Sequence, residues 1–276
     1  MLVNSNELFI KARKGNYAIP ATNYIDLDSA RSYVKVAEQK RLPLILAFAQ
    51  SHKDIISLEE AALIGKFLGE KASVPIVLHL DHGEDYEFIE RAIQLGFTSV
   101  MIDASQKNFD DNIQISKEVV ELAHKFDISV EAELGHVGSN QISFEQGKPD
   151  SIYTETESVI EFVDKTKVDS LAISIGTAHG LYKGTPKINF ERLHEIRELT
   201  DVPLVLHGGS SSGDLNLERC ATEGISKINI YTDFLMGAQH EIEDNGYKNY
   251  IELKNLANVG MEKVLEHYYK VFHTKL

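Results

Sequence analysis

The sequence predicts an α/β protein that folds as a single (β/α)8 barrel, or TIM barrel, with extra C-terminal helices. Three observations support this fold. Eight short apolar runs occur along the chain, segments with helical periodicity separate them, and 276 residues suit one barrel domain. We therefore expect residues 1–276 to form one domain, with the appended helices at about 247–276.

The eight apolar runs are rich in Val, Ile, Leu and Ala. Continuous apolar runs are typical of strands buried on both faces, as in a parallel sheet. An open doubly wound sheet is the alternative, but no Gly-x-Gly-x-x-Gly motif follows the first run. The predicted strands cover residues 17–23, 42–49, 74–82, 99–105, 129–135, 170–176, 203–209 and 227–233.

Helix-start signals lie between the predicted strands. Residues 57–60 (Ser-Leu-Glu-Glu) and 154–157 (Thr-Glu-Thr-Glu) have the pattern of a capping box, and Asp110 and Asp214 are expected N-caps. The link over residues 136–153 stands outside the repeat because it is long and polar. Loops of that length are typical of functional lids or of disorder.

The composition disfavours several classes of protein. A formal net charge of −14 opposes binding to nucleic-acid phosphates, and no run approaches the ~20 apolar residues that a membrane span needs. Cys220 is the only cysteine, which excludes an intrachain disulfide, and residues 1–15 lack a secretory-signal pattern. We expect a cytoplasmic protein without nucleic-acid or membrane partners.

Three histidines stand where predicted strands end: His82 after the third, His179 after the sixth and His207 in the seventh. The carboxyl ends of barrel strands meet at one rim, which carries the active site. Neutral imidazoles on three rigid elements, with a fourth position open, suit a catalytic zinc. The sequence therefore predicts a Zn²⁺ site, with chance placement of three histidines as the alternative.

The other histidines are expected to play ordinary roles. Alternation along the third strand places His79 on the same side as Asp81, which is inside the barrel. The following seven are interpreted as plain surface or core residues: His52, His124, His136, His194, His240, His267 and His273.

Carboxylates end the third, fourth and fifth strands. Asp81 adjoins His82, Asp103 ends the fourth strand, and Glu131 and Glu133 end the fifth. Such a carboxylate can orient a ligand histidine through its second ring nitrogen, or act as a general base near a metal-bound substrate. Most carboxylates on so acidic a chain are solvated, but those at the ends of buried strands need partners.

Small residues after the sixth, seventh and eighth strands indicate a phosphate site. Gly180 and the segment 208–212 (Gly-Gly-Ser-Ser-Ser) form short turns that open toward predicted helices, and residues 229–233 end the last strand. Barrel loops in these positions often bind phosphate through backbone N–H groups and a helix N-terminus. Lys183 would add positive charge, whereas a plain turn is the alternative for the Gly-Gly-Ser segment alone.

Six segments in order resemble the class II, metal-dependent ketose-bisphosphate aldolases, which include fructose- and tagatose-1,6-bisphosphate aldolases. The resemblance runs from about Leu2 to the last helix. The segments are Leu-Asp-His-Gly at 80–83, Ser-Val-Met-Ile-Asp-Ala-Ser at 99–105, Ser-Val-Glu-Ala-Glu-Leu-Gly at 129–135, Gly-Thr-Ala-His-Gly at 176–180, Leu-Val-Leu-His-Gly-Gly at 204–209 and Lys-Ile-Asn-Ile at 227–230.

The resemblance implies an aldehyde-lyase that reversibly cleaves a ketose phosphate, by default fructose 1,6-bisphosphate, into dihydroxyacetone phosphate and an aldehyde through an enediolate. It also implies one catalytic Zn²⁺, a second divalent ion, a monovalent cation, and a homodimer or homotetramer. The implied ligands are His82, His179 and His207, with Asp103 and Glu133 as supporting or alternative metal carboxylates. Asp81 is the implied acid/base for the C4 hydroxyl, and Asn229 the enediolate partner. The implied substrate and phosphate contacts are Asn23, Gly180, Lys183, Gly208, Gly209, Ser210, Tyr231 and Thr232.

Several positions depart from the family pattern. The loop after the fifth strand lacks the expected Gly-Gly-x-Glu-Asp-like signature, and Glu145 is the stand-in for the residue that moves the C3 proton. Tyr231 occupies a position where the fructose type has Asp and the tagatose type often Ala. Ser210-Ser211-Ser212-Gly213 and Gln50-Ser51-His52 are also unusual. Because the changes cluster on the acceptor side, we expect a non-standard aldehyde partner.

Two further classes of function compete with the aldolase. A metal-dependent barrel hydrolase commonly begins with His-x-His on the first strand, and residues 17–23 contain no histidine. A non-catalytic partner subunit is the other alternative, which retention of the three histidines, Asp81 and Asn229 opposes. No lysine is expected inside a strand, so a Schiff-base mechanism is not predicted.

Overall fold

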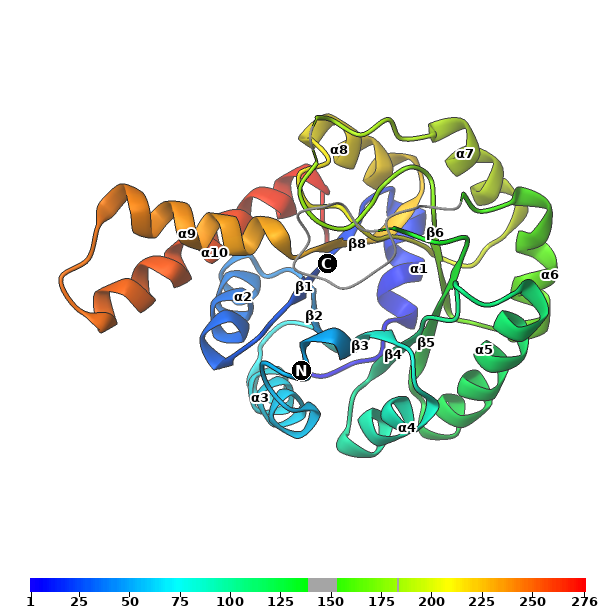
Figure 1. The fold of residues 1–276 in the computed structure, drawn as a ribbon, viewed down its shortest axis with the longest axis horizontal. Helices are drawn as coiled ribbons and strands as arrows, with labels where there is room; N and C mark the ends of the chain where they lie inside the picture. Colours follow the sequence, from blue (N-terminus) through cyan, green and yellow to red (C-terminus); the bar gives the residue numbers. More distant parts are fainter. Residues whose placement is uncertain (139–152, 183) are drawn as a thin grey trace.

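The computed structural model describes residues 1–138, 153–182 and 184–276. Eight parallel strands close into a barrel in chain order, and β1 pairs with both β2 and β8. This confirms the predicted fold class (Figure 1). The strands are β1 (Ile19–Asn23), β2 (Leu44–Ala49), β3 (Ile76–Gly83), β4 (Ser99–Ile102), β5 (Ser129–Leu134), β6 (Ser170–Ile173), β7 (Leu204–Leu206) and β8 (Ile225–Ile230).

Several strands end earlier than the apolar runs that predicted them. β4 ends at Ile102, β6 at Ile173 and β7 at Leu206, although the runs continued to residues 105, 176 and 209. Residues beyond these ends stay buried in loops, as Ile175 does, so burial alone cannot mark the end of a ladder. Gly176 and Gly208 have positive φ, which takes the chain out of the sheet into the rim loops.

Helices connect the strands and cover the barrel. They are α1 (Asn6–Gly15), α2 (Leu27–Lys40), α3 (Leu58–Lys71), α4 (Tyr86–Leu95), α5 (Phe109–Ala123), α6 (Thr156–Thr166), α7 (Phe190–Leu199), α8 (Asp214–Glu223), α9 (Thr232–Asn245) and α10 (Tyr250–Val271). Among these described helices, none is long and apolar enough to span a bilayer.

One predicted capping box is confirmed and the other is wrong. The Ser57 hydroxyl accepts a hydrogen bond from the Glu60 amide, and the Glu60 carboxylate accepts one from the Ser57 amide. In contrast, the Thr154 hydroxyl donates to the carbonyl of Leu134, and α6 begins at Thr156 without a side-chain cap. Thr154 therefore ties the start of α6 to the end of β5.

The two predicted aspartate N-caps are also wrong. Asn108 caps α5 by accepting a hydrogen bond from the Asp111 amide, so Asp110 lies in the first turn. Asp214 is the first residue of α8, after Gly213. Acidic residues suit the first turn as well as the cap, because the helix N-terminus carries partial positive charge, and the sequence pattern did not separate the two positions.

The interior of the barrel changes character along its axis. At the N-terminal end, Leu8, Phe9 and Ala12 of α1 share one apolar cluster with Ile19 of β1 and Val77 of β3. Helix α1 therefore closes the barrel from below. Farther along, inward-facing positions of the strands carry polar side chains instead: His79, Asp81, Glu131 and Lys227, all buried.

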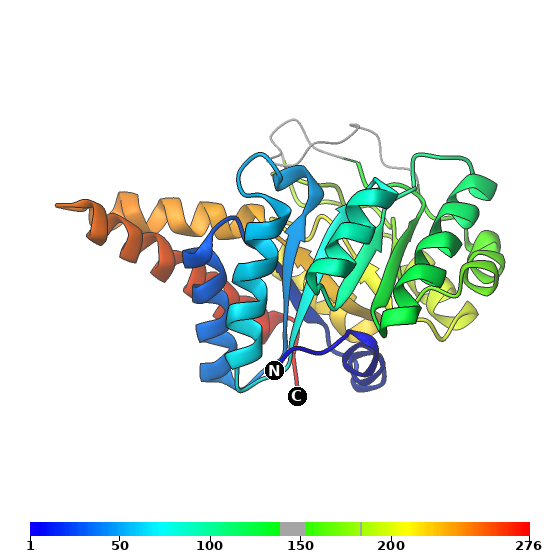
Figure 2. The same ribbon diagram turned by 90° about the horizontal axis from the view of Figure 1, so that it is seen from below.

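Helices α9 and α10 form an arm that projects from one side of the barrel (Figures 1 and 2). The two helices approach closely at Gly237 and Gly260, where a Cβ on Gly260 would lie 2.2 Å from the Gly237 carbonyl oxygen. Of the helices expected over residues 247–276, the structure shows α10. The other helix of the arm, α9, follows β8 directly and contains residues that the sequence had placed in the last strand.

Candidate active site

The three predicted ligand histidines converge at the carboxyl ends of the strands. One ring nitrogen from each of His82, His179 and His207 lies within 4.8 Å of the other two. Their ring centroids are 4.5 to 6.0 Å apart. His207 follows β7 and His82 lies near the end of β3, whereas His179 lies in the loop after β6, where its amide donates to the Gly138 carbonyl at 2.8 Å.

A break in the sheet aims His82 at this cluster. Strict alternation would point His82 away from the side to which His79 and Asp81 point. The β3–β4 register shifts between Leu80 and Gly83, and His82 has a φ of 46°, which is uncommon for a residue other than glycine. The shift therefore lets two consecutive residues, Asp81 and His82, both contribute to the site.

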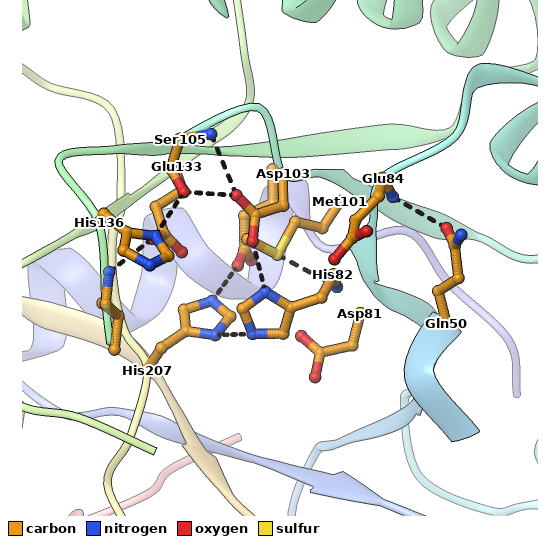
Figure 3. Close-up of polar contacts among 12 residues, drawn as sticks. Gln50, Asp81, His82, Glu84, Met101, Asp103, Ser105, Glu133, His136 and His207 are labelled. Atoms are coloured by element: carbon orange, nitrogen blue, oxygen red, sulfur yellow. Dashed lines mark hydrogen bonds and ion pairs between the residues drawn. The ribbon is translucent and has the colours of Figure 1, made fainter. Parts of the chain in front are cut away.

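Two imidazole nitrogens in the cluster face each other at hydrogen-bond distance. His82 Nδ1 lies 2.8 Å from Asp103 (Figure 3). His207 Nε2 lies 2.8 Å from Glu131. Carboxylates accept hydrogen bonds, so these ring nitrogens donate. The remaining nitrogens, His82 Nε2 and His207 Nδ1, are 2.9 Å apart. In the free protein a proton on one ring can join these two nitrogens in a hydrogen bond, and a divalent cation can take the place of that proton, so the residues fit a divalent cation.

A second group of potential ligands adjoins the first. Single atoms of His82, Asp103 and Glu133 lie within 4.8 Å of one another. Burial, followed by the neighbouring Asp103, raises the pKa of Glu133 to about 8. Its Oε1 accepts from the Val137 amide at 2.8 Å, whereas its buried Oε2 has no hydrogen-bond partner among the described residues. An orphaned carboxylate oxygen facing His82 is what an additional metal position would use.

Below the histidines, a buried ion pair supports His207. Lys227 Nζ lies 2.9 and 2.7 Å from the two oxygens of Glu131, and both side chains are at most 1% exposed. Lys227 Nζ also lies 3.1 Å from His79 Nε2, and His79 Nδ1 lies 2.9 Å from the Ser99 hydroxyl. Burial would raise the pKa of Glu131, but Lys227 and His207 outweigh burial and lower it to about 2.

Lys227 corrects the expectation that no strand contains a buried lysine. It lies within β8 because that strand begins at Ile225, two positions before the predicted start at 227. Both Glu131 oxygens are committed to its ammonium group, so its role here is electrostatic support of His207. The sequence did contain a signal for this role, since alternation places residue 227 on the same side as Asn229.

The Asp81 carboxylate accepts hydrogen bonds from two side-chain amides. Asn23 Nδ2 and Asn229 Nδ2 each donate to one Asp81 oxygen at 2.9 Å. Burial opposes ionisation, but His82, Lys227 and His207 outweigh burial and hold the pKa of Asp81 well below its usual value. The carboxylate is thus an acceptor in the free protein. Asn229 Nδ2 also lies 3.3 Å from His207 Nδ1, which places this amide between the predicted acid/base and a predicted ligand.

A small cavity gathers most of the predicted substrate-binding residues. It is lined by Asn23, His179, Gly180, Gly208, Ser210, Asn229, Tyr231 and Thr232. Thr232 begins α9, so the N-terminus of that helix lies at the cavity. The Ser210 hydroxyl accepts from the Tyr231 amide at 3.1 Å. Helix N-terminal amides and small residues are suited to an anion.

Glycines are required where the rim loops meet. Gly208 has a φ of 65°, and a Cβ there would lie 2.6 Å from the Ala178 carbonyl. Gly209 packs against β8, with a virtual Cβ 2.8 Å from the Asn229 carbonyl oxygen. The Tyr182 hydroxyl joins the same loops by donating to the carbonyl of Gly208 at 2.9 Å. Sequence reasoning missed Tyr182, because nothing in its local pattern distinguishes it from a loop tyrosine.

A second cavity, of about 150 Å³, opens on the other side of the histidines. His179 borders both cavities, and His82 and Asp103 border this one. His136, interpreted from sequence as ordinary, also lines it. The His136 ring is buried, with Nδ1 2.9 Å from the Ser105 hydroxyl. The remaining lining residues are Gln50, Ser51, Lys53, Asp54, Glu84, Gln106 and Val137.

The other predictions have mixed outcomes. Glu145 and Lys183 lie outside the described residues. His52 is buried, with its ring centroid 4.7 Å from that of Tyr231. The histidines that are exposed, as expected for ordinary residues, are His124, His194, His240, His267 and His273.

The chain is similar to known proteins over nearly its whole length. A family model described as fructose-bisphosphate aldolase class-II matches residues 3–275. The chain is 40% identical over 248 residues to the D-tagatose-1,6-bisphosphate aldolase subunit GatY of Klebsiella oxytoca, covering 88% of this chain and 87% of that protein.

Solved structures give the same result. The crystal structure of the YdjI aldolase from Escherichia coli K12 is similar with a TM-score of 0.88 and 30% identity, covering 99% of this chain and 98% of that one. A fructose-bisphosphate aldolase from Campylobacter jejuni, at 22% identity and a TM-score of 0.81 over 99% of this chain and 95% of that one, supports the fold alone. The match over nearly the whole length and the identity to GatY show that the chain belongs to the class II fructose-bisphosphate aldolase family.

Proposed function

We propose that this aldolase reversibly cleaves a ketose 1-phosphate into dihydroxyacetone phosphate and an aldehyde, with a divalent metal, by default Zn²⁺, held by His82, His179 and His207. The observation that carries this proposal is the pair of imidazole nitrogens that face each other at 2.9 Å, each ring backed by a carboxylate. When bound, the metal supplies a Lewis acid that stabilises negative charge on the substrate oxygens.

The chain's own residues perform the proton transfers. In cleavage, the ionised Asp81 takes the proton of the C4 hydroxyl, and the C3–C4 bond breaks to release the aldehyde. Asn229, whose amide lies between Asp81 and His207, supports charge on the enediolate that remains. C3 then takes up a proton, and Glu145 is the proposed donor. In the direction of synthesis, each of these transfers is reversed.

The small cavity is the proposed site of the substrate's C1 phosphate. Its lining supports an anion through Gly180, Gly208, Ser210 and the N-terminus of α9, and Gly209 shapes the turn. Lys183 and a monovalent cation are also proposed to bind this phosphate. His82, Asp103 and Glu133 are the proposed ligands of a second divalent ion.

The identity of the ketose is tested directly. The purified chain, stripped with a chelator and reloaded with Zn²⁺, should release dihydroxyacetone phosphate from a ketose 1-phosphate, measured by a coupled reductase. Fructose 1,6-bisphosphate is the default substrate, and tagatose 1,6-bisphosphate is the alternative favoured by the identity to GatY. A zinc-loaded chain that cleaves no ketose 1-phosphate would contradict the proposal.

A non-catalytic partner subunit is the second candidate function, because the Klebsiella oxytoca relative is described as a subunit. Activity of the purified chain without any other protein would exclude it. The described site favours an enzyme, since His82, His207, Asp81 and Asn229 form one connected hydrogen-bonded group with Asp103 and Glu131. The His179 ring packs against the rings of His82 and His207.

We also propose a homodimer or homotetramer in the cytoplasm. The projecting arm supports self-association, because Tyr247, Tyr250 and Ile251 are exposed near the turn that joins its helices. The buried thiol of the single cysteine, Cys220, is compatible with a reducing compartment.

A further inference from the structure

We propose that the aldehyde half of the substrate is an unphosphorylated hydroxyaldehyde, held in the second cavity beside His82. This inference rests on the proposed aldolase function but replaces the two bisphosphates named above with a ketose 1-phosphate whose aldehyde half carries no phosphate. It concerns the cavity of about 150 Å³ whose rim carries Ser51, Lys53, Asp54, Glu84 and Gln106.

The position of this cavity assigns it to the aldehyde. The small cavity beside Gly208 and Thr232 is the proposed site of the C1 phosphate, and His179 borders both cavities. A ketose anchored there by its phosphate places C2 and C3 at the histidine cluster. Its carbon chain beyond C3 then continues toward His82 and into the second cavity.

The charge of the cavity opposes a second phosphate. Asp54 and Glu84 contribute carboxylates, whereas Lys53 is the one lysine or arginine among the described lining residues. Asp103 also lines the cavity, but its charge is compensated by His82, to which it hydrogen bonds. A phosphorylated aldehyde brings up to two negative charges, and like charges in a partly enclosed site repel strongly.

Hydrogen bonds with the Gln50 side chain hold the backbone at Glu84 beside this cavity. Gln50, 5% exposed at the end of β2, accepts a hydrogen bond from the Glu84 amide at 2.8 Å and donates to Asp85 at 2.6 Å. Figure 3 shows the Glu84 side chain beside the segment that carries Asp81 and His82. These hydrogen bonds hold the backbone of the loop after β3 in place, so Glu84 stays at the lining of this cavity.

The same lining suits hydroxyl groups. Carboxylates accept hydrogen bonds from O–H donors, and the Gln106 amide and Ser51 hydroxyl can both donate and accept. In synthesis, C3 of dihydroxyacetone phosphate loses a proton and forms a bond to the aldehyde carbon, whose oxygen gains a proton. This aldol addition is balanced without a further reactant. The acceptor therefore needs only its carbonyl group for the reaction and its hydroxyl groups for binding.

The test is synthesis by the full-length zinc-loaded chain from dihydroxyacetone phosphate and either D-glyceraldehyde or D-glyceraldehyde 3-phosphate. We expect kcat/KM for glyceraldehyde to exceed that for its phosphate by about tenfold or more, because of like-charge repulsion in the cavity. Added salt should lower KM for the phosphate by screening that repulsion. Equal or better use of glyceraldehyde 3-phosphate would overturn the proposal.

Exchange of the C3 proton of dihydroxyacetone phosphate with solvent deuterium separates the two hypotheses. Exchange without faster use of the unphosphorylated aldehyde contradicts the acceptor assignment but leaves the aldolase function standing. Absence of both exchange and aldol product contradicts the aldolase function, and the acceptor assignment falls with it.

Charge-removing variants locate the effect. In Asp54→Asn/Glu84→Gln, the preference for the unphosphorylated aldehyde should shrink about fivefold or more, since two of the repelling charges are gone. The matched control is Glu87→Gln in the first turn of α4, which is exposed and does not line the cavity. An unchanged preference in the double variant, or an equal change in the control, would show that these carboxylates do not select the acceptor.

Discussion

At the scale of single residues, the proposed metal ligands and the proposed acid/base have different hydrogen-bond partners. His82 and His207 each have one ring nitrogen bound by a carboxylate, so the other nitrogen is oriented before any ligand arrives. Asp81 instead accepts from two side-chain amides and stays ionised. Adjacent residues on one strand therefore have different tasks, set by different partners.

Replacing Asp81 should abolish chemistry without losing the metal. We expect Asp81→Asn to bind zinc as the parent does, because Asp81 is not among the converging ligand groups, and to lose about 10²- to 10⁴-fold in kcat. Metal content by mass spectrometry and kcat from the coupled assay measure the two effects. His82→Ala, as a comparison, should lose metal and activity together. Normal turnover in Asp81→Asn would refute the acid/base role.

Removing Lys227 should destabilise the chain, because Glu131 would keep a buried charge without its ion-pair partner. For Lys227→Met we expect a loss of about 3–5 kcal/mol in the free energy of unfolding and weaker zinc affinity by about 10- to 100-fold, since Glu131 orients His207. Denaturant unfolding and zinc titration measure these. Lys165→Met, which breaks an exposed pair with Glu161, is the control and should change neither.

The Cys220 thiol should be unreactive toward thiol reagents in the folded protein. Burial, with Glu223 nearby, raises its pKa to about 12, so the thiol stays protonated as pH rises to 10. We expect no reaction with a thiol reagent between pH 7 and pH 10 in buffer, and full reaction in denaturant. Labelling that increases with pH in the folded state would show that the helix carrying Cys220 opens.

At the scale of elements, the sequence predicted the order of strands but not the places where they stop. Periodicity and apolar runs identify strands because burial on both faces is an average property of the segment. The turn of His82 toward the site depends instead on the register shift between β3 and β4, which is a property of two strands together. Sequence alone therefore placed His82 at a strand end without explaining its direction.

The turn after β7 offers a test of an element whose backbone is constrained. Gly208→Ala should cost about 1–3 kcal/mol in unfolding free energy, because φ is positive and the new Cβ would meet the Ala178 carbonyl. KM for the ketose phosphate should also rise, since the turn lines the small cavity. Gly184→Ala, with no atom of the described residues within 4 Å of its virtual Cβ, is the control for stability and should behave like the parent in thermal unfolding.

At the scale of the whole molecule, the barrel and the appended α10 could be predicted, and so could the convergence of three histidines. The closed sheet brings all strand ends to one rim, so residues 125 positions apart, such as His82 and His207, become neighbours. The support for those histidines was harder to predict. Lys227 and His136 have partners on other strands or loops, and pairings of that kind are fixed by packing rather than by local pattern.

The arm should govern self-association. We expect Ile251→Lys to shift the protein toward monomers, because the residue is 71% exposed on the arm and a charge there would be buried in a contact. Light scattering after gel filtration measures the mass. Ile160→Lys on α6, also exposed, is the matched control and should leave the mass unchanged. An unchanged mass in Ile251→Lys would place the contact elsewhere.

Helix α1 covers the N-terminal end of the barrel and so limits how solvent reaches the buried polar side chains inside. Leu8 and Phe9 of this helix cover the N-terminal end of the barrel. The buried side chains of His79, Glu131 and Lys227 are therefore shielded from solvent on that side. We expect these groups to exchange protons with solvent from the opposite end of the barrel, at the carboxyl ends of the strands, where the sugar phosphate is proposed to bind. We therefore expect a bound substrate to slow the exchange of protons between these buried groups and solvent for as long as it occupies the site.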